Sequence, residues 1–185
     1  RSGAYARLLG EGVGLPRSQL QALEWAGLLH DIGKIGVPEV VLNKPGPFTA
    51  EEWEQMHRHP QIGHDVLKPV SQLIPVLDAV LLHHENHDGS GYPRGLRGAE
   101  TSLEARIIHV VDIFDALTTA RPYRPANSFE QAFGLLDNGM GTITDPELTR
   151  LFVATLRRYM AADTEGFRTR FGYHVVDQIP PAARN

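Results

Sequence analysis

One stretch is expected to decide the fold of this chain: Leu28–Pro38, which reads LLHDIGKIGVP. An apolar run with helical spacing delivers an imidazole and a carboxylate side by side, and the run then breaks at Gly33. Burial of two ionisable groups costs several kcal/mol unless each has a partner, and a metal ion is an efficient partner for both. The stretch therefore predicts a metal site at the end of an apolar helix.

Composition limits the remaining possibilities. The chain has 185 residues, of which 42% are hydrophobic and 22% charged, values typical of one globular domain with a sizeable core. No apolar run approaches the roughly 20 residues that a membrane span needs, and no signal peptide opens the chain. The chain contains no cysteine, which excludes disulfides and thiolate metal sites and fits a cytoplasmic location. A net charge of −4 argues against DNA as a partner.

Helical periodicity covers most of the chain, and strand signals are nearly absent. We expect an all-α bundle, with a helical domain over 1–162 and an unassigned tail over 163–185. Helix starts are predicted at Ser18, at the capping boxes Thr49/Glu52, Thr101/Glu104 and Ser128/Gln131, and at Asp145-Pro146. Helices are predicted to end near residues 10, 33, 59, 84 and 139, with loops over 36–48 and 85–101.

Side chains suited to metal binding recur at the predicted helix ends and on one buried helix face. Adjacent residues of a helix diverge by about 100°, so a His-Asp or His-His pair fits two ions about 3.5–4 Å apart better than one ion. Imidazoles and carboxylates without thiolates favour Fe or Mn, with Zn, Ni or Co as alternatives. Two such ions promote the hydrolysis of phosphoesters. The candidate ligands are His30, Asp31, His59, His83, His84 and Asp112.

Five ordered motifs make the chain recognisable. His30-Asp31-x-Gly33-Lys34 is followed by HHE at 83–85 and DGSGYP at 88–93, then by DIFDAL at 112–117 and RPYR at 121–124. In this order the motifs resemble those of the HD-GYP family, a branch of the HD metal-dependent phosphohydrolases. The likeness runs from residue 1 to about residue 151. It implies an HD-type helical bundle with a long Gly-rich GYP loop beside the metal site.

The resemblance also implies an activity, namely hydrolysis of the bacterial second messenger cyclic di-GMP to linear pGpG, GMP or both. It assigns the six candidate ligands to two divalent ions, with Asp31 bridging them and Lys34 holding a phosphate as the second catalytic residue. A third ion is left open, because a further family histidine would fall just before Arg1. The residues expected to contact the substrate are Lys34, Tyr92, Asp115, Arg121 and Arg124.

Two other functions stay open at this point. The same chemistry could act on another cyclic dinucleotide or nucleotide, or the domain could be a slow sensor that docks onto diguanylate cyclase domains through its GYP loop. The chain is expected to be the output module of a longer signalling protein, with a sensor or receiver domain before it. The remaining histidines are assigned to packing or to the surface: His57, His64, His87, His109 and His174.

Overall fold

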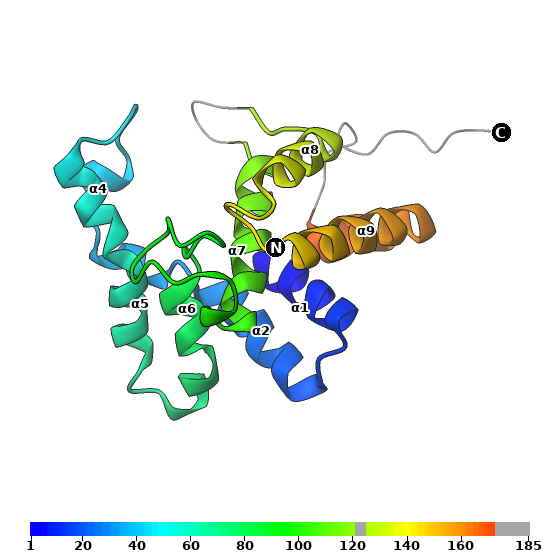
Figure 1. Ribbon diagram of the computed structural model, residues 1–185, viewed down its shortest axis with the longest axis horizontal. Helices are drawn as coiled ribbons and strands as arrows, with labels where there is room; N and C mark the ends of the chain where they lie inside the picture. Colours follow the sequence, from blue (N-terminus) through cyan, green and yellow to red (C-terminus); the bar gives the residue numbers. More distant parts are fainter. Residues whose placement is uncertain (121–124, 173–185) are drawn as a thin grey trace.

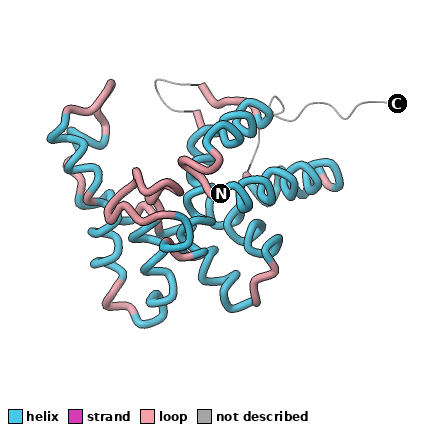
Figure 2. Tube along the Cα trace, in the orientation of Figure 1, coloured by secondary structure: helices cyan, strands magenta, loops and turns pink. Residues whose placement is uncertain are grey.

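The computed structural model describes residues 1–120 and 125–172, and these residues form helices and loops without a β-strand (Figure 2). The all-α prediction is therefore confirmed. The helices are α1 (Ser2–Val13), α2 (Arg17–Leu29), η1 (Ile32–Gly36), α3 (Glu39–Leu42), α4 (Ala50–His57), α5 (His59–Leu67), η2 (Ser71–Val76), α6 (Leu77–Leu82), η3 (Gly98–Glu100), α7 (Leu103–Thr118), α8 (Phe129–Gly139), α9 (Pro146–Ala162) and α10 (Thr164–Phe171). In the described residues no helix is both long and apolar enough to cross a membrane.

Helix α7 is the central element of the bundle, and α1, α2, α6, α8 and α9 all contact it (Figure 1). Its sequence is apolar on more than one side, so that Ile107, Ile108, Val110 and Val111 are completely buried. A helix that is apolar all round must be covered all round. This burial fixes the position of Asp112, which belongs to the same helix.

Aromatic side chains fill the part of the core away from the candidate site. Tyr5 of α1 meets Phe114 and Phe152 edge to face, at centroid distances of 5.3 and 5.9 Å. It also stacks on Phe171 of α10 at 4.4 Å. Helix α10 falls within the tail that sequence left unassigned, and Phe167 and Phe171 are completely buried there. The first part of the tail, up to residue 172, is thus packed into the same core.

Several predicted helix starts are confirmed. The capping boxes of Thr49 with Glu52 and of Ser128 with Gln131 are both formed. Asp145 caps α9 by accepting bonds from the backbone N–H groups of Glu147 and Leu148. The short side-chain acceptors at these positions satisfy amide groups that have no partner inside the helix.

Two predicted starts are wrong, one by two residues and the other by one. Helix α2 begins at Arg17 and not after Ser18, because Pro16 is extended (φ −67°, ψ 157°) and the helix starts directly after it. Helix α7 is capped by Ser102, whose hydroxyl accepts from the amide of Ala105, and not by Thr101.

Some predicted helix ends also differ. Helix α1 continues past Gly10 to Val13, and the expected loop over 36–48 contains the short helix α3. The expected helix before His84 is divided, with 3₁₀ geometry through Pro75 and α-helix only from Leu77. Helix α2 ends at Leu29, ahead of Gly33, and a 3₁₀ turn follows.

Gly33 shows why the chain leaves the α-helix here. A Cβ atom on Gly33 would lie 1.9 Å from the carbonyl oxygen of His59 and 2.5 Å from the amide nitrogen of Gly63. The 3₁₀ turn thus runs directly against the backbone of α5, closer than any side chain would allow. This contact brings the segment after Asp31 next to the start of α5.

Candidate metal centre

The six candidate ligands come together where several helices begin or end. His30 and Asp31 directly follow α2, His59 is the first residue of α5, and His83 and His84 follow α6. Asp112 lies on α7. Their ligand atoms form two groups in which all atoms lie within 4.8 Å of one another: Asp31, His59, His83 and His84; and His30, Asp31 and Asp112. Asp31 belongs to both groups, as a bridging carboxylate would.

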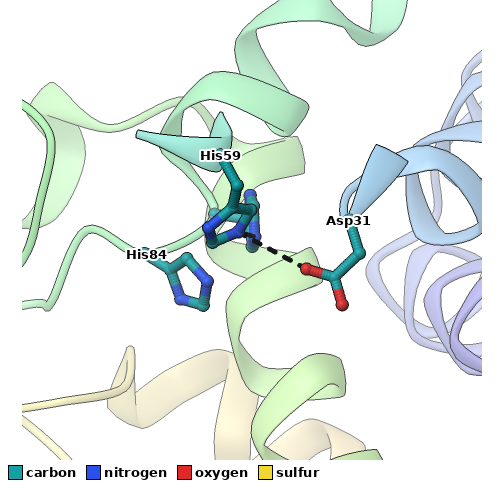
Figure 3. A group of neighbouring side chains, drawn as sticks. Asp31, His59 and His84 are labelled. Carbon is teal, nitrogen blue, oxygen red and sulfur yellow. Dashed lines mark hydrogen bonds and ion pairs between the residues drawn. The ribbon is translucent and has the colours of Figure 1, made fainter. Parts of the chain in front are cut away.

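One part of the spacing argument was wrong. Neighbouring residues were expected not to converge on one position, yet His83 and His84 belong to the same group. The expectation holds for a regular helix, but α6 ends at Leu82 and both histidines follow its end. Their ring centroids are only 4.1 Å apart. In Figure 3 the rings of His59 and His84 and the carboxylate of Asp31 are directed toward a common region.

Three of the imidazoles are held in place by the same kind of hydrogen bond. In each, Nδ1 donates a hydrogen bond to the backbone carbonyl three residues earlier: His30 to Gly27 at 3.0 Å, His59 to Met56 at 2.7 Å and His83 to Val80 at 2.8 Å. A carbonyl can only accept, so Nδ1 must carry the proton. This bond fixes the ring orientation and leaves Nε2 as the metal-binding nitrogen, as in many metal sites.

The Nε2 atoms of His59 and His83 show whether a cation fits between these two rings. Their Nε2 atoms lie 3.4 Å apart, with both rings already donating through Nδ1. Two neutral rings in this tautomer present lone pairs to each other, which is unfavourable in a buried place. His59 is 1% exposed and His83 is not exposed at all, so water cannot screen the pair. The geometry fits a cation that both nitrogens would bind.

The carboxylates of Asp31 and Asp112 also favour a cation, beside His30. Nε2 of His30 lies 3.4 Å from Oδ2 of Asp31 and 3.4 Å from Oδ1 of Asp112. Burial lowers the pKa of His30, but the hydrogen bonds and charges of Asp112 and Asp31 outweigh it and raise this pKa to about 10. Two carboxylates around one buried nitrogen thus favour positive charge at this position.

The ionisation states of the other five candidate ligands suit metal binding. Burial lowers the pKa of His84 to about 2 and also lowers the pKa of His59 and that of His83, so these rings are neutral at pH 7. Burial opposes ionisation of Asp31 and Asp112, but the neighbouring His30 outweighs it and lowers the pKa of both carboxyls. Neutral imidazoles and charged carboxylates are the forms that coordinate a metal.

The centre is open to solvent at Asp31 and Lys34. The side chain of Asp31 is 37% exposed and that of Lys34 36%, with Nζ of Lys34 2.6 Å from Oδ2 of Asp31. The dashed line in Figure 3 joins the other oxygen of Asp31 to Nε2 of His59, at 3.4 Å. A ligand can therefore approach the centre from the side of Lys34.

Tyr92, expected to contact substrate, lies against the centre. Its ring stacks on His84 at 4.8 Å and on His57 at 4.0 Å, so neighbours occupy both of its faces. Burial, with the charges of Asp112 and Asp31, raises the pKa of its hydroxyl, which stays protonated. The ring braces the loop, and the hydroxyl is the group left for a ligand.

The other expected substrate contacts are Asp115 and two arginines of the RPYR motif. Asp115 lies one turn after Asp112 on α7 and forms an ion pair with Arg1, Nε to Oδ1, at 2.9 Å. Arg121 and Arg124 lie outside the described residues.

Two buried residues support the centre and were not singled out from sequence. Glu85 is 3% exposed, and its carboxylate accepts from the amides of Arg94 at 2.6 Å and Leu96 at 3.0 Å, which holds the loop after His84. His109 of α7 donates through Nδ1 to the backbone carbonyl of His83 at 2.7 Å. The HHE motif could have pointed to Glu85, whereas His109 had been assigned to packing and offers no signal of its own.

Comparisons with known proteins agree with this geometry. A family model described as HD domain matches residues 1–148. The chain is 43% identical over 148 residues to the cyclic di-GMP phosphodiesterase response regulator RpfG of Xanthomonas campestris pv. campestris, covering 79% of this chain and 39% of that protein. It is 38% identical over 147 residues to 3'3'-cGAMP-specific phosphodiesterase 3 of Vibrio cholerae, covering 80% of this chain and 32% of that protein.

A solved structure shares the fold. It is described as Bd1817, a HDG"Y"P protein from Bdellovibrio bacteriovorus, and superimposes with a TM-score of 0.68 at 20% sequence identity. The match covers 84% of this chain and 51% of that one. The chain spans about two fifths or less of the curated relatives named above, and their names give two different cyclic dinucleotides as substrates.

Proposed function

Because the chain belongs to the HD domain family, in its HD-GYP branch, we propose that it is a metal-dependent phosphodiesterase that hydrolyses cyclic di-GMP. The observation that carries this proposal is the pair of ligand groups that share Asp31. We propose cyclic di-GMP, which has two guanines, as the substrate rather than 3'3'-cGAMP, because the relative named for cyclic di-GMP has the higher identity, 43% against 38%. Linear pGpG, GMP or both are the expected products.

The proposal assigns one divalent ion to His30, Asp31 and Asp112. A second belongs to the group of Asp31 with His59, His83 and His84. Fe or Mn are the first choices for these nitrogen and oxygen ligands, with Zn, Ni or Co as alternatives and a third ion left open. When bound, such a pair stabilises the attacking and leaving oxygens of an in-line displacement and lowers the pKa of a bound water.

The chain's own residues supply binding and orientation. Lys34 lies beside the bridging carboxylate and is half open to solvent, so its ammonium can hold a phosphate oxygen near Asp31. The protonated hydroxyl of Tyr92 offers a second hydrogen-bond donor to a ligand. Arg121 and Arg124 stay predicted contacts to phosphate or guanine edges, for which the guanidinium is suited.

Turnover measurements test the proposal. The protein, loaded with Mn(II) or Fe(II), should hydrolyse cyclic di-GMP faster than cyclic GMP-AMP or a nucleotide monoester. Asp31→Ala should abolish turnover because both ligand groups lose a member, whereas Arg121→Ala should mainly raise KM. Asp78→Ala, which removes an exposed carboxylate on α6, is the matched control. Equal activity of Asp31→Ala and the parent would refute the mechanism.

A slow sensor remains the competing function, and a measured kcat far below about 1 s⁻¹ for every dinucleotide would favour it. Docking of diguanylate cyclase domains on the GYP loop, a preceding sensor or receiver domain, and a cytoplasmic location stay predictions.

A further inference from the structure

A row of aromatic rings leads outward from the candidate metal centre. Starting at His84, the row passes to Tyr92 at 4.8 Å, then to His57 at 4.0 Å, to Trp53 at 5.2 Å and to Phe48 at 5.1 Å. Of the four contacts, only the one between Trp53 and His57 lies within a single helix. We call these five residues the aromatic row.

Tyr92, inside the row, is covered by neighbouring rings, whereas Trp53, near the outer end, is open to solvent. Tyr92 is covered by His84 and His57, and Phe48 meets Trp53 edge to face at an interplanar angle of 87°. Trp53 is 47% exposed. Among the described residues it is the only Trp, Tyr or Phe side chain left so open to solvent.

The charge around Trp53 suits an anionic ligand better than the acidic sequence of α4 suggests. Trp53 and His57 are four residues apart and share one face of the helix, to which Ala50 also belongs. Around the helix axis, Glu51 points about 160° away from Trp53 and Glu54 about 100° away from it. Glu52 is neutralised by Lys44, with Nζ 2.5 Å from Oε2. The exposed indole thus has no carboxylate among the residues three or four positions away, which are its neighbours on the helix surface.

We propose that Trp53 forms a stacking subsite for one purine base of the cyclic dinucleotide. The inference rests on the proposed function, which brings a phosphate to Asp31 and Lys34. The bases of such a substrate extend outward from its sugar–phosphate ring, so a base must meet surface next to the centre. Helix α4 stands next to α5, which begins with His59 (Figure 1). Aromatic side chains are the usual platforms for unpaired bases.

Kinetics of two substitutions test the subsite. Trp53→Ala should raise KM for cyclic di-GMP about tenfold, in line with the usual strength of base–aromatic stacking, and leave kcat unchanged. Trp53→Phe keeps a ring and should restore most of the affinity. Val40→Ala, which truncates another exposed apolar side chain (78% exposed), is the matched control and should keep the parental KM.

Fluorescence gives a second readout that does not depend on turnover. The chain has two tryptophans, so Trp25→Phe leaves Trp53 as the only emitter, and Trp53→Phe leaves Trp25. A slowly hydrolysed phosphorothioate analogue of cyclic di-GMP should quench the first variant by stacking and leave the second unchanged. Quenching of Trp25 alone, or of neither tryptophan, would contradict the subsite.

The two measurements separate failure of the subsite from failure of the proposed function. A parent protein that hydrolyses no cyclic dinucleotide refutes the function. A parent that hydrolyses cyclic di-GMP, together with a Trp53→Ala variant of parental KM and an unquenched Trp53, refutes the subsite alone.

Discussion

Replacement of Gly33 by alanine should disrupt the centre without changing the side chain of any candidate ligand. The new Cβ would lie 1.9 Å from the carbonyl oxygen of His59, whereas Cβ contacts under 3.0 Å are essentially never seen. The turn after Asp31 and the start of α5 must therefore separate by about 1 Å, and a displacement of that size at a catalytic centre costs about 100-fold in rate. Overpacking of this kind also costs about 1–3 kcal/mol of stability.

The assay is kcat/KM for cyclic di-GMP, with metal content and thermal unfolding measured on the same samples. The backbone of Gly33 does not have positive φ, so the substitution introduces no conformational strain beyond the contact. Gly36→Ala is the control within the same turn, because its Cβ would meet only the flexible side chain of Ile62, at 2.9 Å. Gly134→Ala, at an exposed position of α8 with nothing within 4 Å of the new Cβ, should stabilise by about 0.5–1 kcal/mol. Parental activity and metal content in Gly33→Ala would refute the reasoning.

Substitutions at three further residues test their supporting roles. His109→Asn, which keeps a donor in the place of Nδ1, should retain activity, whereas His109→Gln should lose about tenfold in metal affinity because the carbonyl of His83 loses its donor; equal titration curves would contradict this. Glu85→Ala should lower Tm and expose the following loop to protease, since two amides lose their acceptor; an unchanged digestion pattern would refute it. Burial raises the pKa of Asp145, but the amide of Leu148 and the Arg106 side chain outweigh it, so the folded pKa is lowered. Asp145→Asn should thus be about 1–2 kcal/mol less stable at pH 7, a difference that closes as the pH falls below about 4; a difference independent of pH would contradict this.

Helix positions were predictable from sequence where local chemistry alone decides them. Thr49 and Asp145 start their helices because a short side chain satisfies nearby amides, and this depends on a few adjacent residues. The cap predicted at Ser18 is wrong, because Pro16 sets the start of the helix two residues earlier.

Tertiary contacts decided what local sequence could not. The end of α2 depends on the approach of Gly33 to the backbone of α5, which no local pattern contains. The same holds for the inward packing of α10. Phe167 and Phe171 are four residues apart, a helical spacing, but two apolar positions alone do not predict a helix packed into the core.

The candidate site followed from motifs, but its orientation did not. The types and order of the six ligands were visible in sequence, and the structure brings all six together. The Nδ1 bonds that aim the imidazoles depend on backbone carbonyls at helix ends, and the role of His109 depends on α7 crossing behind His83. The shared position of His83 and His84 was missed because the regular helix stops just before them.

Metal stoichiometry tests the central claim most directly. Protein purified without oxygen or chelator and analysed by inductively coupled plasma mass spectrometry should contain at least two transition-metal ions per chain, and Asp31→Ala should lose both because that carboxylate belongs to each ligand group. A parent protein that binds no such ion, or an Asp31→Ala variant that keeps the parental metal content, would contradict the account.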